Sequence, residues 1–233
     1  MMRTLLAALI LSLSGWAAAA DYPAGKARFD RFTPDQQTAL TLALIATGDF
    51  EGLAEHGFTR RFYDAVRRFE RREGYPADGI LEEDEIARLT ALADRFYERL
   101  GNRYYTHPRT GAKLLVPRKL FDSERNTEDG MLFDRDDGML SLSFVSFRQE
   151  DRSFDALYRT LTAGTPDRRV IYQRRFPTHF VATGFFTGRK FYTWMARTGA
   201  STTGFTVSWS DEWEEMGRKL SVLLANAFLA DPG

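Results

Sequence analysis

The chain contains no cysteine and few histidines, and these shortages exclude several kinds of chemistry. Without cysteine it can form no disulfide, carry no lipid on a cysteine near its N-terminus and use no thiol nucleophile. The three histidines, His56, His107 and His179, do not share a helix at a spacing that ligates zinc. We therefore expect no metal site and no cofactor.

An excess of charge of one sign is also absent. The 233 residues include 32 lysines and arginines and 32 aspartates and glutamates. A dedicated nucleic-acid-binding protein needs a basic field to attract phosphates. The balanced charge therefore argues against nucleic acid as a partner.

Long apolar runs are missing as well, except near the N-terminus. The run Leu5–Leu13 follows Arg3, is shorter than the ~20 residues that span a membrane, and precedes the small residues Ala17–Ala20. This pattern predicts a secretory signal peptide over residues 1–20, cleaved near Ala18–Ala20, with an uncleaved anchor as the alternative. We expect a mature protein with no stable membrane span, located in the periplasm or secreted, and associated with the cell envelope.

Residues 33–100 have a helical pattern. Thr33, Pro34 and Gln36 have the spacing of an N-cap, a first helical position and a capping box, and Gly48 is placed to end that helix. A second helix is expected from about Thr59 to Glu73, ended by Gly74, and a third from about Glu82 to Leu100. Together they predict an N-terminal three-helix bundle.

After Gly101 the pattern changes to strands. "GNRYYTHPRTG" is typical of a linker or of the entry to a second domain, and short runs rich in β-branched and aromatic residues follow, with turn residues between them. Helices are expected from Ser153 to about Leu161 and from Asp211 to Leu229. The predicted fold class is α+β, with the bundle followed by a domain over residues 104–230 in which helices cover an antiparallel sheet.

A weak repeat links two turn-then-helix segments in the bundle, "EHGFTRRFYDAV" and "DGILEEDEIARL". Here the segment from about Gln36 to Leu92 resembles the small three-helix peptidoglycan-binding domain of bacterial cell-wall enzymes. The matching positions are Phe58, Ala65-Val66, Phe69, Gly74, Asp78-Gly79 and Leu89. The departures are Glu55-His56 for the first Asp-Gly, Thr59 for the second glycine, Phe62 for a threonine, Glu70 for the usual glutamine, and Glu82 and Glu85 for a glycine and a threonine.

The resemblance implies a peptidoglycan ligand, either glycan or stem peptide. Its candidate binding residues here are Tyr63, Tyr75, Asp78 and Gly79, where the tyrosines and nearby arginines could stack on a sugar or pair with a carboxylate. The alternative is that the turn only shapes the chain, with Asp78 as the cap and Gly79 as the turn residue.

Candidate catalytic residues are scattered. A triad of Ser141 or Ser208 with His179 lacks a nucleophile-elbow pattern. "FDRDDG", residues 133–138, suits a hairpin turn better than a calcium loop. His107 is expected to be exposed in the linker, and Glu124, Glu128 and Asp129 in a polar loop. We predict no catalytic residues.

The second half, through "SFDALYRTL", "HFVATGFFTGRKFYTWMA" and "EWEEMGRKLSVLLANAF", resembles the PsbP/Mog1-like α/β/α sandwich. That group is mostly non-catalytic and implies a protein partner. The leading hypothesis is an exported envelope protein that binds peptidoglycan through its helical domain and presents a non-catalytic partner-binding domain. The alternatives are a peptidoglycan-targeted hydrolase with an unrecognised catalytic C-terminal domain, and a helical domain that serves only as a docking surface.

Overall fold

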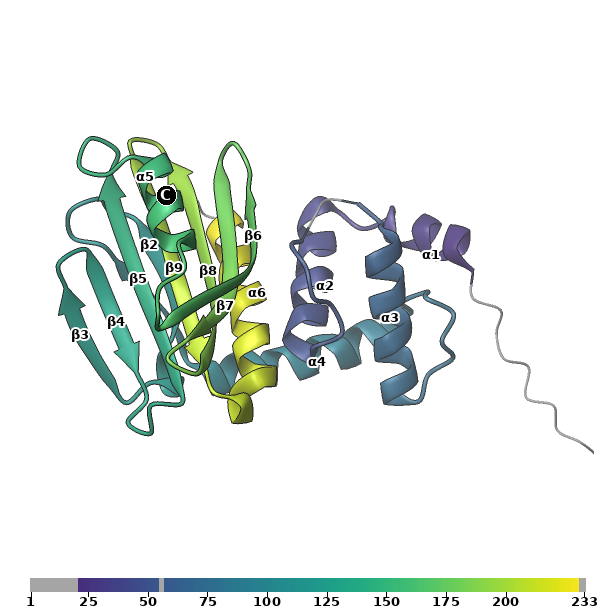
Figure 1. Ribbon diagram of the computed structural model, residues 1–233. Helices are drawn as coiled ribbons and strands as arrows, with labels where there is room; N and C mark the ends of the chain where they lie inside the picture. The colour runs from purple at the N-terminus through teal and green to yellow at the C-terminus, as the bar shows by residue number, and fades with distance from the viewer. Residues whose placement is uncertain (1–20, 55–56, 231–233) are drawn as a thin grey trace, which may run out of the picture.

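The structure, a computed structural model, describes residues 21–54 and 57–230 (Figure 1). Four helices come first and a seven-stranded antiparallel sheet with two further helices follows, which confirms the α+β class. The predicted signal peptide and the Glu55-His56 position lie outside the described residues. No described helix combines the length and the apolar character that crossing a membrane requires.

Local capping chemistry sets the ends of the helices. The helical part consists of α1 (Tyr22–Phe29), α2 (Pro34–Thr47), α3 (Arg60–Glu73) and α4 (Glu83–Leu100). Thr33 and Gln36 form the predicted capping box, and Gly48 and Gly74 end α2 and α3 in the left-handed conformation. Helix α1 was not predicted, and its Phe29 packs 4.5 Å from the ring of Phe62.

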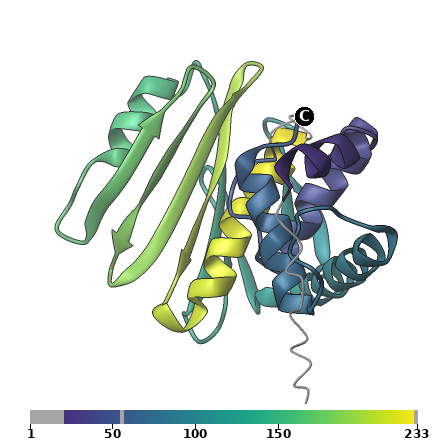
Figure 2. The same ribbon diagram turned by 90° about the vertical axis from the view of Figure 1, so that its right-hand side faces the viewer.

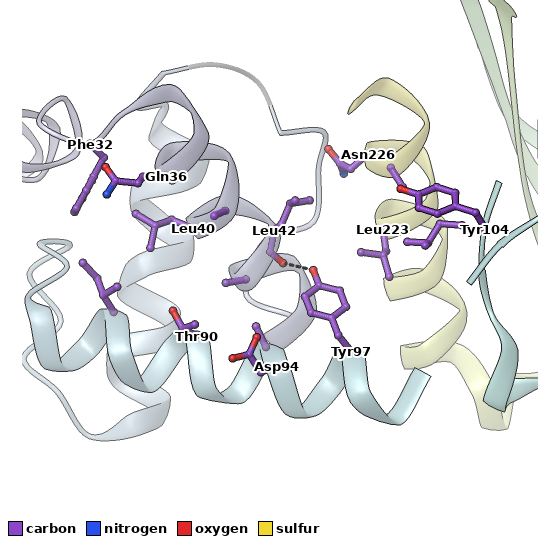
Figure 3. A pocket seen from close by; sticks show the side chains of 16 residues that line it. Phe32, Gln36, Leu40, Leu42, Thr90, Asp94, Tyr97, Tyr104, Leu223 and Asn226 are labelled. Atoms are coloured by element: carbon purple, nitrogen blue, oxygen red, sulfur yellow. Dashed lines mark hydrogen bonds between the residues drawn. The ribbon is translucent and has the colours of Figure 1, made fainter. Parts of the chain in front are cut away.

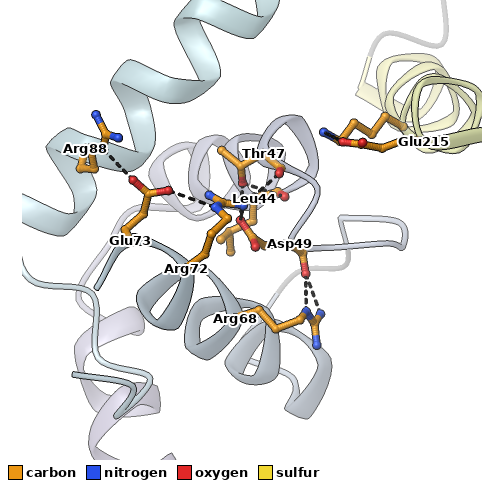
Figure 4. A network of polar contacts seen from close by, with 9 residues as sticks. Leu44, Thr47, Asp49, Arg68, Arg72, Glu73, Arg88 and Glu215 are labelled. Atoms are coloured by element: carbon orange, nitrogen blue, oxygen red, sulfur yellow. Dashed lines mark hydrogen bonds and ion pairs between the residues drawn. The ribbon is translucent and has the colours of Figure 1, made fainter. Parts of the chain in front are cut away.

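A polar network ties the ends of these helices together (Figure 4). The buried carboxylate of Asp49 accepts hydrogen bonds from Thr47 and Arg72, both at 2.7 Å. Glu73 accepts from Arg72 at 3.0 Å and from Arg88 at 2.8 Å. The C-terminal ends of α2 and α3 and the first half of α4 are thereby fixed to one another.

The sheet has the strand order β3-β4-β5-β9-β8-β7-β6, and every neighbouring pair is antiparallel. Its strands are β3 (Ser123–Thr127), β4 (Gly130–Asp134), β5 (Leu140–Arg148), β6 (Arg168–Arg175), β7 (His179–Phe186), β8 (Arg189–Thr198) and β9 (Ser201–Trp209). The short helices η1 (Arg118–Leu120) and η2 (Asp211–Trp213) precede β3 and the last helix.

The segment after α4 forms a hairpin, so of the two expectations for it, a linker or a domain entry, the linker is wrong. β1 (Asn102–Thr106) begins two residues after α4 ends and pairs with β2 (Lys113–Pro117) as a separate hairpin. The segment that we expected as a polar loop also contains a strand, because Glu124 lies on β3. The predicted turn at "FDRDDG" is confirmed: Gly138 has φ +68° and Asp137 accepts from the Met139 N–H at 2.9 Å.

The two remaining helices cover opposite faces of the sheet (Figures 1 and 2). Helix α5 (Phe154–Thr162) packs on Phe147, Phe180 and Met195. Helix α6 (Glu214–Ala230) packs on the face that carries Phe144 and Phe205.

Helix α6 also joins the sheet to the bundle. It lies between the sheet and helices α2–α4, and contacts α2 on one side and β9 on the other (Figure 1). The Asn226 side chain donates to the Gly52 carbonyl at 3.1 Å and accepts from the Ala54 N–H at 2.6 Å. One continuous apolar core therefore runs from α1 to the sheet.

Candidate ligand-binding groove

The four predicted binding residues gather around the turn between α3 and α4. Gly79 has φ +81°, and its N–H points between both carboxylate oxygens of Glu70, at 2.9 and 3.1 Å. The Asp78 carboxylate accepts from the Ile80 N–H at 2.9 Å, which is an Asx turn. These contacts give Asp78 and Gly79 the structural roles that the alternative interpretation of the turn assigns to them.

Burial at this turn contradicts two of the proposed contacts. Tyr63 is only 2% exposed, and its ring packs so closely on Gly79 that a Cβ there would lie 2.1 Å from a ring atom. The guanidinium groups of Arg60 and Arg67 lie 5.7 and 5.6 Å from its ring centroid. Tyr63 and buried Gly79 are thus closed to a sugar, because their surfaces are already covered.

Tyr75 and Asp78 keep partial exposure. The Tyr75 ring centroid lies 6.3 Å from that of Phe69, so one side of it supports the core. Asp78 has its carboxylate in the Asx turn. The four residues come together as predicted, but the turn offers only these two side chains to a ligand.

A better-formed site lies elsewhere on the helical part. A groove of about 540 Å³ opens between α2, α4 and α6 (Figure 3). Its apolar walls are built from small and branched side chains, Ala39, Leu40, Ala43, Ile86, Ala93, Leu223 and Ala227. Tyr104 and Leu115 of the β1–β2 hairpin close the end nearest the sheet.

Two polar side chains in the groove are already occupied. The Tyr97 hydroxyl donates to the Leu42 carbonyl at 3.2 Å, and burial raises the pKa of Tyr97 to about 12, so the phenol stays neutral. Asn226 is held by its bonds to Gly52 and Ala54. These two groups stiffen the walls.

Three other polar side chains lie at the mouth, and the Oε1 of one of them, Gln36, already accepts from the Thr33 N–H at 2.9 Å. Thr90 and Asp94 point from α4 toward α2, where Gln36 lies (Figure 3). Asp94 is exposed and forms no ion pair with any residue that the structure describes. The groove therefore combines an apolar floor with one free carboxylate and two hydrogen-bonding groups, which suits an uncharged or cationic ligand with small apolar groups.

The candidate catalytic residues are not brought together. His179 stacks between Phe176 and Trp194, with centroids 4.3 and 4.4 Å away, and burial lowers its pKa. Trp194 pairs with Phe205, and Ser208 lies three residues further along β9, so its side chain points to the opposite face from His179. Ser208 and Ser141 instead bond to each other at 2.7 Å.

The acidic candidate Glu124 is also far from His179. Glu124 on β3 and His179 on β7 are five strand spacings apart, about 24 Å at about 4.8 Å for each spacing. Glu124 forms an ion pair with Arg118. Over residues 21–54 and 57–230, no cluster of three or more histidine or acidic side chains is arranged to hold a metal ion.

His107 corrects a further expectation, because it is buried rather than exposed. Only 2% of it is accessible, and burial lowers the pKa of its imidazole. Its Nδ1 accepts from the Thr110 N–H at 3.3 Å, and its Nε2 lies 3.2 Å from the Asp129 carbonyl. These bonds hold the β1–β2 loop against the β3–β4 turn.

Comparison with known proteins identifies no family. No family model matches the chain, and no curated protein matches it. Among solved structures it is similar to cyanobacterial PsbP (CyanoP) from Synechocystis sp. PCC 6803, with 13% sequence identity and a TM-score of 0.40. That similarity covers 53% of this chain and 89% of the cyanobacterial chain.

Proposed function

We propose that the protein is an exported, non-catalytic component of the bacterial cell envelope that binds peptidoglycan at the groove between α2, α4 and α6. Export is supported by the signal-like pattern of residues 1–20. On this proposal the mature protein acts in the periplasm or outside the cell. Its helical part holds it at the wall, and its α+β part is presented to a protein partner.

The free carboxylate of Asp94 above a floor of methyl groups carries this proposal. Peptidoglycan stem peptides combine alanine with a diamino acid, so they offer methyl groups and an ammonium group within a few residues. The methyl groups match the walls at Ala39, Ala43 and Ala93, and the ammonium group matches Asp94. The side-chain N–H groups of Gln36 and the hydroxyl of Thr90 are placed for the peptide groups of the ligand.

On this proposal the wall contact lies in the groove and not at the α3–α4 turn. Tyr63 and Gly79 are buried there, whereas the groove is open and its lining is small enough for a peptide backbone to approach. Tyr75 and Asp78 then have roles in the fold of the bundle and need not touch the ligand.

Sedimentation with purified sacculi tests the proposal. The full mature chain, starting at Asp21, is compared with Ala39→Trp, which fills the groove from an exposed position, and with Asp94→Asn. Ala91→Trp is the matched control, because Ala91 is exposed on α4 but does not line the groove. We expect the parent and Ala91→Trp to sediment, Ala39→Trp to stay soluble, and Asp94→Asn to bind several-fold more weakly, as for the loss of one exposed ion pair.

Two results would contradict the proposal. Equal sedimentation of Ala39→Trp and the parent would place the wall contact outside the groove, and no sedimentation of any form would remove wall binding. The same samples are assayed for release of soluble wall fragments. Release by the parent chain would support the hydrolase alternative instead.

A further inference from the structure

One end of the sheet carries an unusual charge distribution. In a chain with balanced charge, residues 168–198, which form β6, β7 and β8, contain seven basic residues and no acidic residue. The seven are Arg168, Arg169, Arg174, Arg175, Arg189, Lys190 and Arg197. Because β6 is the edge strand, this charge is concentrated at one border of the sheet.

Some of these cations are neutralised by nearby carboxylates. Arg175 and Arg197 lie against Asp155 of α5, and Lys190 bonds to Asp211 and Glu214. The remaining four arginines form no ion pair with the residues described in the structure. A positive charge excess therefore remains on this part of the sheet.

Two of the unpaired arginines are exposed, and each is held in place by stacking on an aromatic ring. The Arg169 guanidinium lies 5.0 Å from the ring centroid of Phe185, and that of Arg174 lies 4.7 Å from that of Phe176. Stacking of this kind restricts an arginine side chain and leaves its N–H groups free to bind an anion. Less side-chain entropy is then lost when a carboxylate is bound.

Exposed apolar side chains lie between these arginines. Arg169 pairs with Phe185, Tyr172 with Thr183 and Arg174 with Val181, so the three β6 side chains share one face of the sheet. Tyr172 is 51% exposed and its neighbour Ile171 is 62% exposed. We call Arg169, Ile171, Tyr172 and Arg174 the basic strip. The strip lies on the face of the sheet that α6 also contacts, because Val181 pairs with Trp194 and Trp194 with Phe205, and β6 forms the outer border of that face.

The strip also has an open backbone edge and a neighbouring cleft. β6 pairs with β7 only, and no other described strand pairs with its outer side. A cleft of about 450 Å³ adjoins it, with Ile171, Phe185, Tyr192 and Val222 among its walls. An extended peptide that adds to such an edge gains main-chain hydrogen bonds, while alternate side chains reach the sheet face.

Charge determines which occupant fits this edge. A second β6 would place four arginines against four arginines, which disfavours self-pairing. A strand with alternating carboxylates would instead meet Arg169 and Arg174 on one face of the sheet, with its apolar residues on the opposite face beside Val170. We propose that the basic strip binds an extended acidic segment of a partner protein, which adds to the sheet beside β6. The inference deepens the proposed partner-binding role of the α+β part and does not depend on wall binding.

Fluorescence anisotropy with a synthetic probe tests the inference on the full mature chain. The probe is a labelled octapeptide of alternating glutamate and valine. A second peptide has the same residues in two blocks, and a third has N-methyl groups on alternate residues, which removes strand pairing without changing charge. The protein variant is Arg169→Glu/Arg174→Glu, and Arg95→Glu/Arg99→Glu on exposed positions of α4 is the matched control.

We expect the alternating peptide to bind the parent and the α4 control with affinities within twofold of each other. The strip variant should bind at least tenfold more weakly, and the N-methylated and block peptides should not bind. Equal binding of all three peptides would overturn strand addition and leave only a surface for anionic polymers. A dimer that the strip variant abolishes would assign the edge to a second copy.

Peptide binding and sedimentation with sacculi together distinguish a loss of partner binding from a loss of wall binding. The strip variant should sediment with sacculi as the parent does, because the groove on the bundle is unchanged. If the alternating peptide fails to bind the parent while sedimentation persists, only the partner inference is lost. Circular dichroism of each variant establishes that the exposed substitutions leave the fold intact.

Discussion

Glu70 is a carboxylate with no exposed surface, at the turn between α3 and α4. Burial raises its pKa to about 7, and the nearby carboxylates of Asp78 and Glu85 add to this effect. The N–H of Gly79 donates to it and partly offsets the cost of burial.

We expect Glu70 to make the protein less stable as the pH rises through neutrality. A pKa raised in the folded state means that stability is fully present below the unfolded value of 4.5 and is lost as the pH rises through about 7. At about 1.4 kcal/mol per pKa unit, the change is roughly 3 kcal/mol. Glu70→Gln should remove this loss, because its amide oxygen still accepts from Gly79.

Urea unfolding of the parent and Glu70→Gln at pH 5 and pH 8 measures this effect. The variant should be the more stable protein at pH 8, with a smaller difference between the two pH values. Glu98→Gln, an exposed change on α4, should follow the parent at both. If Glu70→Gln has the same pH dependence as the parent, the carboxylate does not titrate in this range.

At the scale of elements, the α3–α4 turn contains two glycines with similar backbone angles and different surroundings. Gly74 has φ +84° and Gly79 has φ +81°. A Cβ on Gly74 meets nothing within 4 Å, whereas one on Gly79 would lie 2.1 Å from the Tyr63 ring. Both positions favour glycine for backbone reasons, but only Gly79 is also required by packing.

Alanine substitution separates these two causes. Gly74→Ala should lower the free energy of unfolding by about 1 kcal/mol, the cost of a side chain in the left-handed region. Gly79→Ala should lower it by about 3 kcal/mol or more, because the Tyr63 ring must also move in a packed core. Thermal or urea unfolding gives both values. Similar losses for the two variants would mean that the ring moves at little cost.

Elements set by local chemistry could be predicted from the sequence. The Thr33–Gln36 capping box and Gly48 fix both ends of α2 through contacts within a few residues. The cap of α5 at Ser153 is equally local. Helix α1 could not be predicted, because it is only eight residues long, Gly25 weakens its pattern, and its stability comes from packing against residues more than thirty positions away.

The groove and the surroundings of the candidate residues depend on contacts between residues that are far apart in the sequence. Residues of α2 and α6 line the groove together, and no local sequence pattern indicates that Ala39 and Leu223 line the same cavity. His107 was expected in a linker, but the β1–β2 hairpin buries it. Tyr63 was a reasonable candidate for stacking on a sugar, and only the approach of Gly79 shows that its ring is covered.

At the scale of the whole molecule, α6 makes the bundle and the sheet share one core. Leu44 of α2 is fully buried within this core, and α6 contacts both α2 and β9. Asn226 adds hydrogen bonds between α6 and the segment after α2. The unfolding of either half would expose the apolar surface of the other, so we expect the two halves to unfold in a single transition.

Leu44→Ala tests this coupling. Loss of a fully buried leucine side chain should cost about 3–5 kcal/mol. Trp194, Trp209 and Trp213 all lie in the sheet half, so tryptophan fluorescence of the mature chain follows that half, while circular dichroism at the helical band is dominated by the bundle and α6. Both signals should shift together to lower urea concentration, because α6 transmits the loss of packing to the sheet. A fluorescence transition that stayed in place while the helical signal shifted would mean that the two halves fold independently and that α6 belongs to the sheet alone.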